Sequence, residues 1–203
     1  MANLKNVYTP SSMRVIGRAA FQYCDKLEEI HLPETVTSIG YEAFYGNGTN
    51  LALGILGLNL DHLPSSLEYI GDRAFCNAGN RIVLKELPNT VKTIGTQAFM
   101  SCGNVSINHF GGEGSALQQI GYQAFRSANN IAADVTEITI NTGVVLKDGN
   151  NNTAYNTFGM GYPSVTSLRI GAGCENKYGD DTAALIADLF EETGRNITVS
   201  NLA

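Results

Sequence analysis

A six-residue phrase recurs through most of the sequence, and it limits the chain to folds that are built by stacking similar units. Each copy reads Ile-Gly, then two variable residues, then Ala-Phe. The five clear copies occupy residues 16–21, 39–44, 70–75, 94–99 and 120–125, and a degenerate sixth copy spans 153–158. Repetition with a period of roughly 20 to 30 residues predicts a solenoid, in which each coil buries its apolar face against its neighbours.

A second phrase precedes each Ile-Gly pair and predicts a strand that ends in a bend. Leu32-Pro33 leads into the second copy, and Leu-Pro recurs at 63–64 and 87–88. Proline fixes φ and lacks a backbone donor, so it closes a strand. The glycine of each Ile-Gly pair predicts either a close approach of two backbones or a positive φ. The Ala-Phe pair is expected to end a short helical or 3₁₀ turn, with the aromatic ring in the core.

Apolar and polar residues alternate in the segment that follows each Phe and its polar link. This alternation predicts one half-buried strand in each coil. Clear examples are residues 27–32, 135–140 and 165–170.

The motif as a whole resembles a known repeat. Phe-x-x-Cys-x-x-Leu-x-x-Ile-x-Leu-Pro-x-x-Val-x-x-Ile-Gly-x-x-Ala-Phe is present in full from Phe21 to Phe44, and it is similar to the BspA-like leucine-rich repeat. The resemblance is close over about residues 8–128 and loose over 129–170. It implies a right-handed leucine-rich-repeat solenoid of about six coils, mainly β with short helical or 3₁₀ turns. It also implies a non-enzymatic recognition module.

The C-terminal segment has a different pattern, which predicts a cap for the last coil. Asp180-Asp181-Thr182 are expected to begin a helix that runs through Thr193, and residues 197–199 a final strand. The apolar face of the helix consists of Leu185, Ile186, Leu189 and Phe190. We therefore expect residues 1–203 to form a single solenoid, with coils over about 8–175 and a cap over 176–203. A contact of this helix with a following domain or another chain is the alternative.

The four cysteines predict thiols, not a disulfide framework. Cys24 and Cys102 each lie three residues after a repeat phenylalanine, a position that holds Asn47, Ala78 and Ala128 in other copies. Coils stack about 4.8 Å apart, so these two cysteines, three coils apart, would be separated by roughly 14 Å. A disulfide needs Cα atoms within about 7 Å. We expect both to be buried free thiols, and Cys76 and Cys174 have no obvious partner.

Composition and motifs argue against several classes of function. The formal net charge of −6 disfavours nucleic acid and anionic membranes as partners, because both require a basic surface. No stretch reaches the roughly 20 apolar residues of a membrane span. The N-terminus, residues 1–5, lacks an apolar signal segment. No catalytic motif, phosphate loop or cofactor motif is recognisable, so we expect no enzyme activity and no cofactor. Residues 148–152 imitate a calcium loop only briefly, and calcium is not expected there.

One column of the repeat carries the most informative polar residues. Aligning the strands on the residue before proline places all three histidines of the chain at the position just before it. The column holds His31, His62, Glu86, His109, Thr139 and Arg169. The second, third and fourth members of this column belong to segments with an extra polar residue, at 60–63, 84–87 and 107–110. An unbulged register would bury Asp61, Lys85 and Asn108, which is costly without partners.

We therefore predict a β-bulge repeated in three consecutive coils. It would turn two polar stripes outward, Asp61-Lys85-Asn108 beside His62-Glu86-His109, and form a partner-binding ridge. At successive steps of about 4.8 Å, His62, Glu86 and His109 could only just converge on one zinc ion. A metal site is therefore the weaker interpretation, and a solvated strand face without a function is the other.

Together these observations predict a non-enzymatic protein-interaction or adhesion module that binds a protein or glycan surface ligand through its repeated strand face. The resemblance implies a bacterial or protist cell-surface location. The missing signal segment leaves a second hypothesis, a structural or receptor-binding component of a phage particle or other multi-chain assembly.

Overall fold

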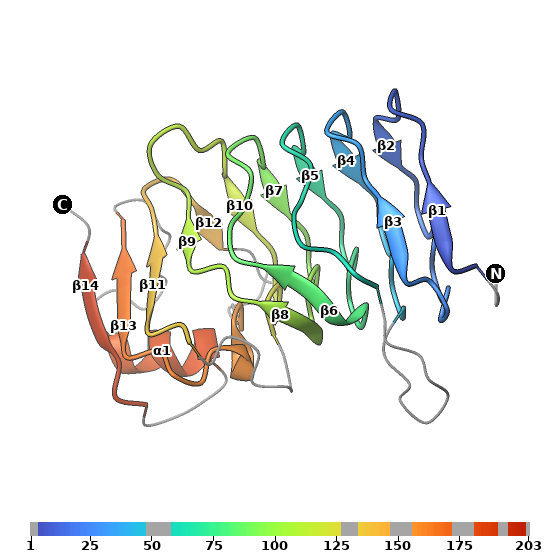
Figure 1. Cartoon of the computed structure of the whole chain (residues 1–203). Coiled ribbons are helices and arrows are strands. Elements are labelled where there is room, and N and C mark those ends of the chain that lie inside the picture. Colours follow the sequence, from blue (N-terminus) through green and yellow to red (C-terminus); the bar gives the residue numbers. More distant parts are fainter. Residues whose placement is uncertain are drawn as a thin grey trace.

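The computed structural model describes residues 4–47, 58–126, 134–146, 156–171, 181–190 and 195–201. Within them the chain winds into a row of similar coils, with β1 near one end and β14 at the other (Figure 1). Three features of the sequence lie outside the described residues: the insertion at 51–57, the calcium-like segment at 148–152, and Cys174. Within the described residues the structure is mainly β, with parallel strands and one α-helix, as expected.

One face of the stack is a six-stranded parallel sheet, and five of its strands end in the isoleucine of an Ile-Gly phrase. The strand order is β12-β10-β7-β5-β4-β2, so each coil pairs only with the coils before and after it. The strands are β2 (Val15–Ile16), β4 (Ser38–Ile39), β5 (Tyr69–Ile70), β7 (Thr93–Ile94), β10 (Gln119–Ile120) and β12 (Val145–Leu146). The isoleucines pair in register and are buried, which makes this sheet continuous from the first coil to the sixth.

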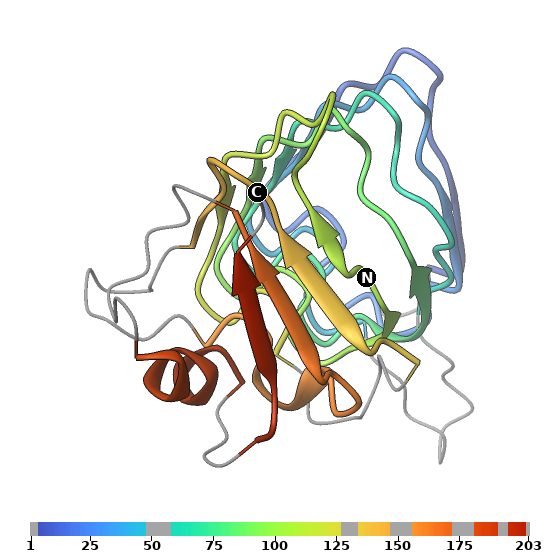
Figure 2. The same cartoon turned by 90° about the vertical axis from the view of Figure 1, so that its left-hand side faces the viewer.

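The other strands form a second face, here called the strand face, which lies apart from the six-stranded sheet when the stack is viewed end on (Figure 2). It is divided into three ladders: β1-β3, β6-β8 and β9-β11-β13-β14. The strands are β1 (Asn6–Tyr8), β3 (Glu29–His31), β6 (Gly79–Leu84), β8 (Cys102–Val105), β9 (His109–Phe110), β11 (Glu137–Ile140), β13 (Ser167–Ile170) and β14 (Thr198–Asn201). The strands expected within 27–32, 135–140 and 165–170 are present, and each begins two residues later than the pattern suggested.

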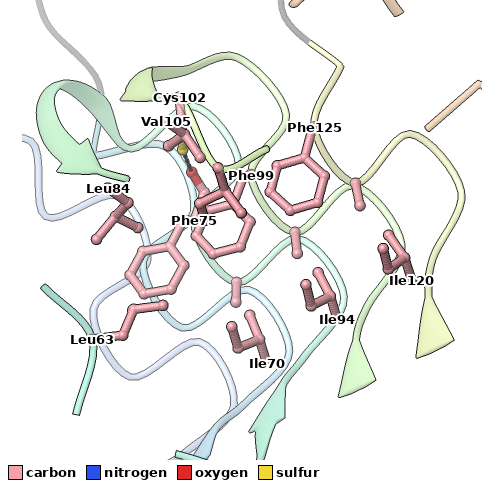
Figure 3. Packing of buried hydrophobic residues seen from close by; sticks show 14 of the residues in the cluster. Leu63, Ile70, Phe75, Leu84, Ile94, Phe99, Cys102, Val105, Ile120 and Phe125 are labelled. Carbon is pink, nitrogen blue, oxygen red and sulfur yellow. Dashed lines mark hydrogen bonds between the residues drawn. The ribbon is translucent and has the colours of Figure 1, made fainter. Parts of the chain in front are cut away.

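A row of aromatic rings runs through the core. Phe44, Phe75, Phe99 and Phe125 stack in sequence, with ring centroids 5.2 to 5.4 Å apart. Figure 3 shows three of these rings, those of Phe75, Phe99 and Phe125. Phe21 continues the stack at one end, 5.4 Å from Phe44. Offset-stacked rings at this spacing are a favourable aromatic geometry. The Ala-Phe pairs of the second to fifth copies therefore fill the core, as the sequence predicts, and the pair of the first copy is half-buried at the end of the stack.

The repeat glycine is required because two backbones approach closely, and not because φ is positive. A Cβ atom added to Gly121 would lie 2.5 Å from Gly95 C and 2.5 Å from Thr96 N in the preceding coil. In the first coil the equivalent Gly17 has nothing within 4 Å of such an atom. Positive φ occurs two residues later, at Ala19, Glu42, Arg73, Gln97 and Gln123.

A helix covers the C-terminal end of the core, as expected. In α1 (Thr182–Phe190) the four residues predicted to form the apolar face are all buried, and Asp181 caps its first turn by accepting a hydrogen bond of 3.0 Å from Ala184 N. Phe190 stacks on Phe158 at 5.5 Å, which extends the aromatic row. A short 3₁₀ segment, η2 (Gly159–Gly161), follows Phe158. No helix within the described ranges is long and apolar enough to span a membrane.

The three described cysteines are buried free thiols, which confirms the prediction for Cys24 and Cys102. Asn47 and Ala78, at the same repeat position, are also buried. The Cys102 thiol donates a hydrogen bond of 2.6 Å to Phe75 O (Figure 3). Burial raises the pKa of each thiol, that of Cys76 to about 11.

Candidate functional site

The six residues predicted to form the ridge lie on the solvent side of the strand face. Asp61, His62, Lys85, Glu86 and His109 are exposed. Asn108 is half-buried, and its Nδ2 donates a hydrogen bond of 3.2 Å to Glu137 O. The apolar residues that flank each polar pair are buried, apart from the half-buried Leu87. The outward placement expected for these side chains is therefore present for five of the six, and Asn108 bonds to the next coil.

The backbone places them outward by a different means from the predicted bulge. The described register irregularity lies between Gly79 and Val83, before the polar pairs. Residues 61–63, 85–88 and 106–108 belong to no strand. The ladder is interrupted at 61–63 and 85–87, whereas Ser106 N still donates to Leu84 O and Asn108 O still accepts from Thr139 N. The strand pairings of the described residues join His109 to Thr139, but none joins His62, Glu86 and His109 to one another.

The interruption follows from unequal coil lengths between two fixed pairings. Leu60 pairs with Ile82 on the strand face, and Tyr69 pairs with Thr93 on the six-stranded sheet. Tyr69 comes nine positions after Leu60, whereas Thr93 comes eleven positions after Ile82. Parallel strands pair residue by residue, so a coil with two surplus residues cannot remain in register with its shorter neighbour. The two segments therefore separate between these pairings.

The separation leaves a groove of about 600 Å³, here called the central groove. Its polar rim is formed by Asp61, His62, Lys85 and Glu86. Its apolar lining is formed by Leu63, Val83, Leu84, Leu87 and Pro88, and Ser65 lies beside them. A volume of this size falls within the range of ligand pockets, and an apolar lining with a few polar groups is their usual composition.

Smaller hollows flank the central groove on both sides. One of about 210 Å³ lies toward the N-terminal coils and is lined by His31, Asn59, Asp61 and His62, among others. The other, of about 290 Å³, is lined by Lys85, Glu86, His109 and Gly111, among others. Five of the six predicted residues therefore line a hollow, and Asn108 lines none of these three.

His62 lies between two carboxylates at the rim of the central groove. Its Nδ1 is 2.6 Å from Asp61 Oδ1, and its Nε2 is 3.5 Å from Glu34 Oε1. Glu34 Oε2 also accepts a hydrogen bond of 2.6 Å from Ser65 N. The hydrogen bond with His62 holds the pKa of Asp61 below its ordinary value. The pKa of Glu34 is lowered mainly by the backbone N–H of Ser65.

The geometry does not support the metal interpretation. Across the described part of the chain, no three or more His, Cys, Asp and Glu side chains come together in a group that could hold a metal ion. His62, Glu86 and His109 therefore do not form one. What the site offers is a row of hydrogen-bonding and charged groups around an apolar floor.

Comparison with known families agrees with this arrangement of coils. A model of the BspA type leucine rich repeat region matches residues 1–53 and 54–156 in six copies. The chain belongs to this family. Membership supports a repeat module for protein interaction, and the leucine-rich repeats of such modules are typically non-enzymatic.

Comparison with individual proteins adds little. A crystal structure of a leucine-rich repeat protein from Bacteroides ovatus ATCC 8483 is similar at 17% identity and a TM-score of 0.41. The alignment covers 98% of this chain and 61% of that one, so this chain spans about three fifths of its length. No curated protein matches the sequence.

The sequence analysis did not identify two residues of the site, Glu34 beside His62 and Val83 in the lining of the central groove. Glu34 belongs to the preceding coil, and its position directly after Pro33 gives no sign that it reaches His62. Val83 is an apolar residue with 39% of its surface exposed. The motif alignment contains one sign of this exposed apolar residue. Val83 lies four residues before Leu87, and the equivalent position in two other coils is polar, Asn59 and Ser106.

Proposed function

We propose that this chain is a non-enzymatic adhesion module that binds a protein partner at the central groove and its rim. The observation that supports this most directly is the coincidence of two independent features. Five of the six polar residues singled out by the repeat alignment line the three hollows described above, and four of these five lie where the ladder is interrupted.

The chemistry of the groove suits a protein partner. Leu63, Leu84 and Leu87 offer apolar contact, and the rim offers one cation, Lys85, beside two exposed carboxylates. Protein interfaces combine such an apolar centre with a polar rim. The family supports protein binding in general, and the choice of this groove and of an adhesive role is the proposal.

A cell-surface location fits adhesion and follows the family resemblance. The same face could equally dock a neighbouring chain in a particle, which is the assembly hypothesis. The two differ in where the partner is found, so one capture experiment separates them.

The test uses the immobilised chain and solubilised surface proteins of candidate host and neighbour cells. Wild type is compared with the triple variant His62→Ala, Glu86→Ala, His109→Ala. The matched control is Tyr41→Ala, Tyr122→Ala, which alters the turns after the six-stranded sheet. All three chains are first required to have equal melting temperatures.

We expect a surface protein that wild type and the control capture and that the triple variant does not. Capture by wild type and the triple variant alike would refute the groove as the site. If surface fractions yield nothing while purified chain assembles with particle proteins, the adhesion proposal falls and the assembly hypothesis replaces it.

A further inference from the structure

The central groove also exposes unpaired backbone on both of its walls. The N–H groups of His62 and Leu63 on one wall, and of Lys85, Glu86 and Leu87 on the other, have no hydrogen-bond partner among the described residues. The C=O groups of 61–63 and 85–87 are likewise unpaired. In the adjoining ladders the equivalent groups pair with the next coil, as in β11 and β13.

Both walls are held in a conformation that suits strand pairing. Leu63 and Leu87 each precede a proline, and a residue before proline is restricted to extended backbone. Pro64 O and Pro88 O accept hydrogen bonds from the turns that follow, at 3.0 Å in each case, which fixes the end of each wall. The two extended segments are therefore kept open by the local sequence and by the unequal coil lengths.

We propose that the occupant of the central groove is an extended polypeptide segment that adds as a strand between 61–63 and 85–87. This deepens the proposed function and rests on it, because it names the conformation of the partner at the same site. Strand addition gives affinity through main-chain hydrogen bonds, while alternate side chains enter pockets and give specificity. An inserted strand would restore the pairing that the surplus residues of the longer coil interrupt.

The lining indicates which side chains the segment carries. Alternate side chains of a strand point to opposite sides, so one set would enter the apolar lining formed by Leu63, Leu84 and Leu87. The other set would face the rim, where Asp61 and Glu86 outnumber Lys85. We therefore infer an alternation of apolar and basic residues in the bound segment.

The test uses a defined probe, a fluorescein-labelled decapeptide of alternating valine and lysine, and the full chain. Two further peptides carry N-methyl groups on all valines or on all lysines, which removes the N–H donors of one strand edge and leaves the side chains unchanged. A valine–glutamate decapeptide tests charge. Binding is measured by fluorescence anisotropy, and amide hydrogen exchange locates the bound peptide.

We expect the valine–lysine peptide to bind and each N-methylated peptide to bind at least tenfold more weakly, because several hydrogen bonds are lost from one edge. Because successive N–H groups of an extended segment point to opposite edges, bound peptide should slow exchange of those unpaired amides that face the groove and leave the others unchanged. Val83→Trp, which fills the groove, should abolish binding, whereas Arg169→Trp, on an exposed strand position outside it, should not.

Equal binding of the N-methylated peptides would overturn strand addition, since charge alone would then hold the probe. Exchange slowed in β14 and not at the groove would also overturn it, because the peptide would then extend an end of the stack. Neither result depends on the capture experiment. If capture is lost in the triple variant while the peptides fail, the proposed function stands and the strand proposal does not.

Discussion

The close approach of neighbouring coils predicts opposite effects for the same substitution at two copies of one motif. Gly121 and Gly17 both follow the isoleucine of an Ile-Gly phrase. An added Cβ at Gly121 would meet three backbone atoms at 2.5, 2.5 and 2.8 Å, whereas at Gly17 it would meet nothing within 4 Å. Backbone atoms cannot rotate away as a side chain can, so Gly121→Ala must force two coils apart.

The magnitude follows from the contacts that this movement would break. Carbon atoms are in good contact at about 3.5 to 4.0 Å, so the coils would have to separate by about 1 Å. The hydrogen bonds Gly121 N to Ile94 O and Gln97 N to Tyr122 O, both 2.8 Å, would then exceed a good length. Two such bonds contribute about 1 to 3 kcal/mol, and overpacking costs about 1 to 3 kcal/mol. We expect Gly121→Ala to lower the free energy of unfolding by about 2 to 6 kcal/mol.

Gly17→Ala should leave the free energy of unfolding unchanged or raise it by about 0.4 to 1 kcal/mol, because alanine restricts the unfolded chain. Urea denaturation followed by circular dichroism measures both variants against wild type. Equal losses at the two glycines, or a Gly121→Ala variant within about 0.5 kcal/mol of wild type, would refute the close-approach explanation.

Three further predictions follow from the aromatic row, the groove rim and the thiols. Phe75→Ala should lower the free energy of unfolding by about 3 to 5 kcal/mol, because its ring is fully buried between two others. Phe21→Ala should lower it by less, because Phe21 is half-buried with one stacked neighbour. Urea denaturation measures both variants. In NMR titrations His62→Ala should raise the pKa of Asp61 toward its ordinary value but leave that of Glu34 low, since Ser65 N–H, the main cause of its lowered pKa, remains. Because both folded pKa values are lowered, the stability they contribute is present above about pH 4 and lost as pH falls through the folded values. Iodoacetamide at pH 8 should modify the described thiols only after unfolding in urea, as mass spectrometry would show, because burial raises their pKa. These thiols are Cys24, Cys76 and Cys102.

The sequence predicts those features that each coil repeats within itself. The aromatic row, the buried thiols and the buried face of α1 all follow from side chains whose spacing recurs or fits one helix, and all are present. The exposure of His62 and Glu86 follows in the same way from two polar residues between apolar ones.

The central groove depends on the difference in length between two neighbouring coils. An alignment on the motif does not reveal this difference, because it does not give the backbone pairing between the coils. Aligning on proline sets Leu58 beside Ile82, whereas the backbone pairs Leu60 with Ile82. The register is fixed where each strand begins, and β6 begins at Gly79, only four residues after Phe75. Strand register is specified by what each strand packs against. An alignment that counts back from the proline at the end of the strand therefore assigns the wrong pairing residue in the neighbouring coil.

The two faces differ in how continuously their coils pair, and this explains how the ladder of the strand face can be interrupted while the core stays intact. The six-stranded sheet pairs every coil from β2 to β12, and the aromatic row is continuous beside it. The coils that diverge at the central groove are therefore still joined by Tyr69 and Thr93 and by the stacked rings of Phe75 and Phe99. Stability in a solenoid resides in the interfaces between neighbouring coils. Substitutions at the rim of the groove should consequently change binding with little effect on folding, which is what makes the capture experiment with matched melting temperatures feasible.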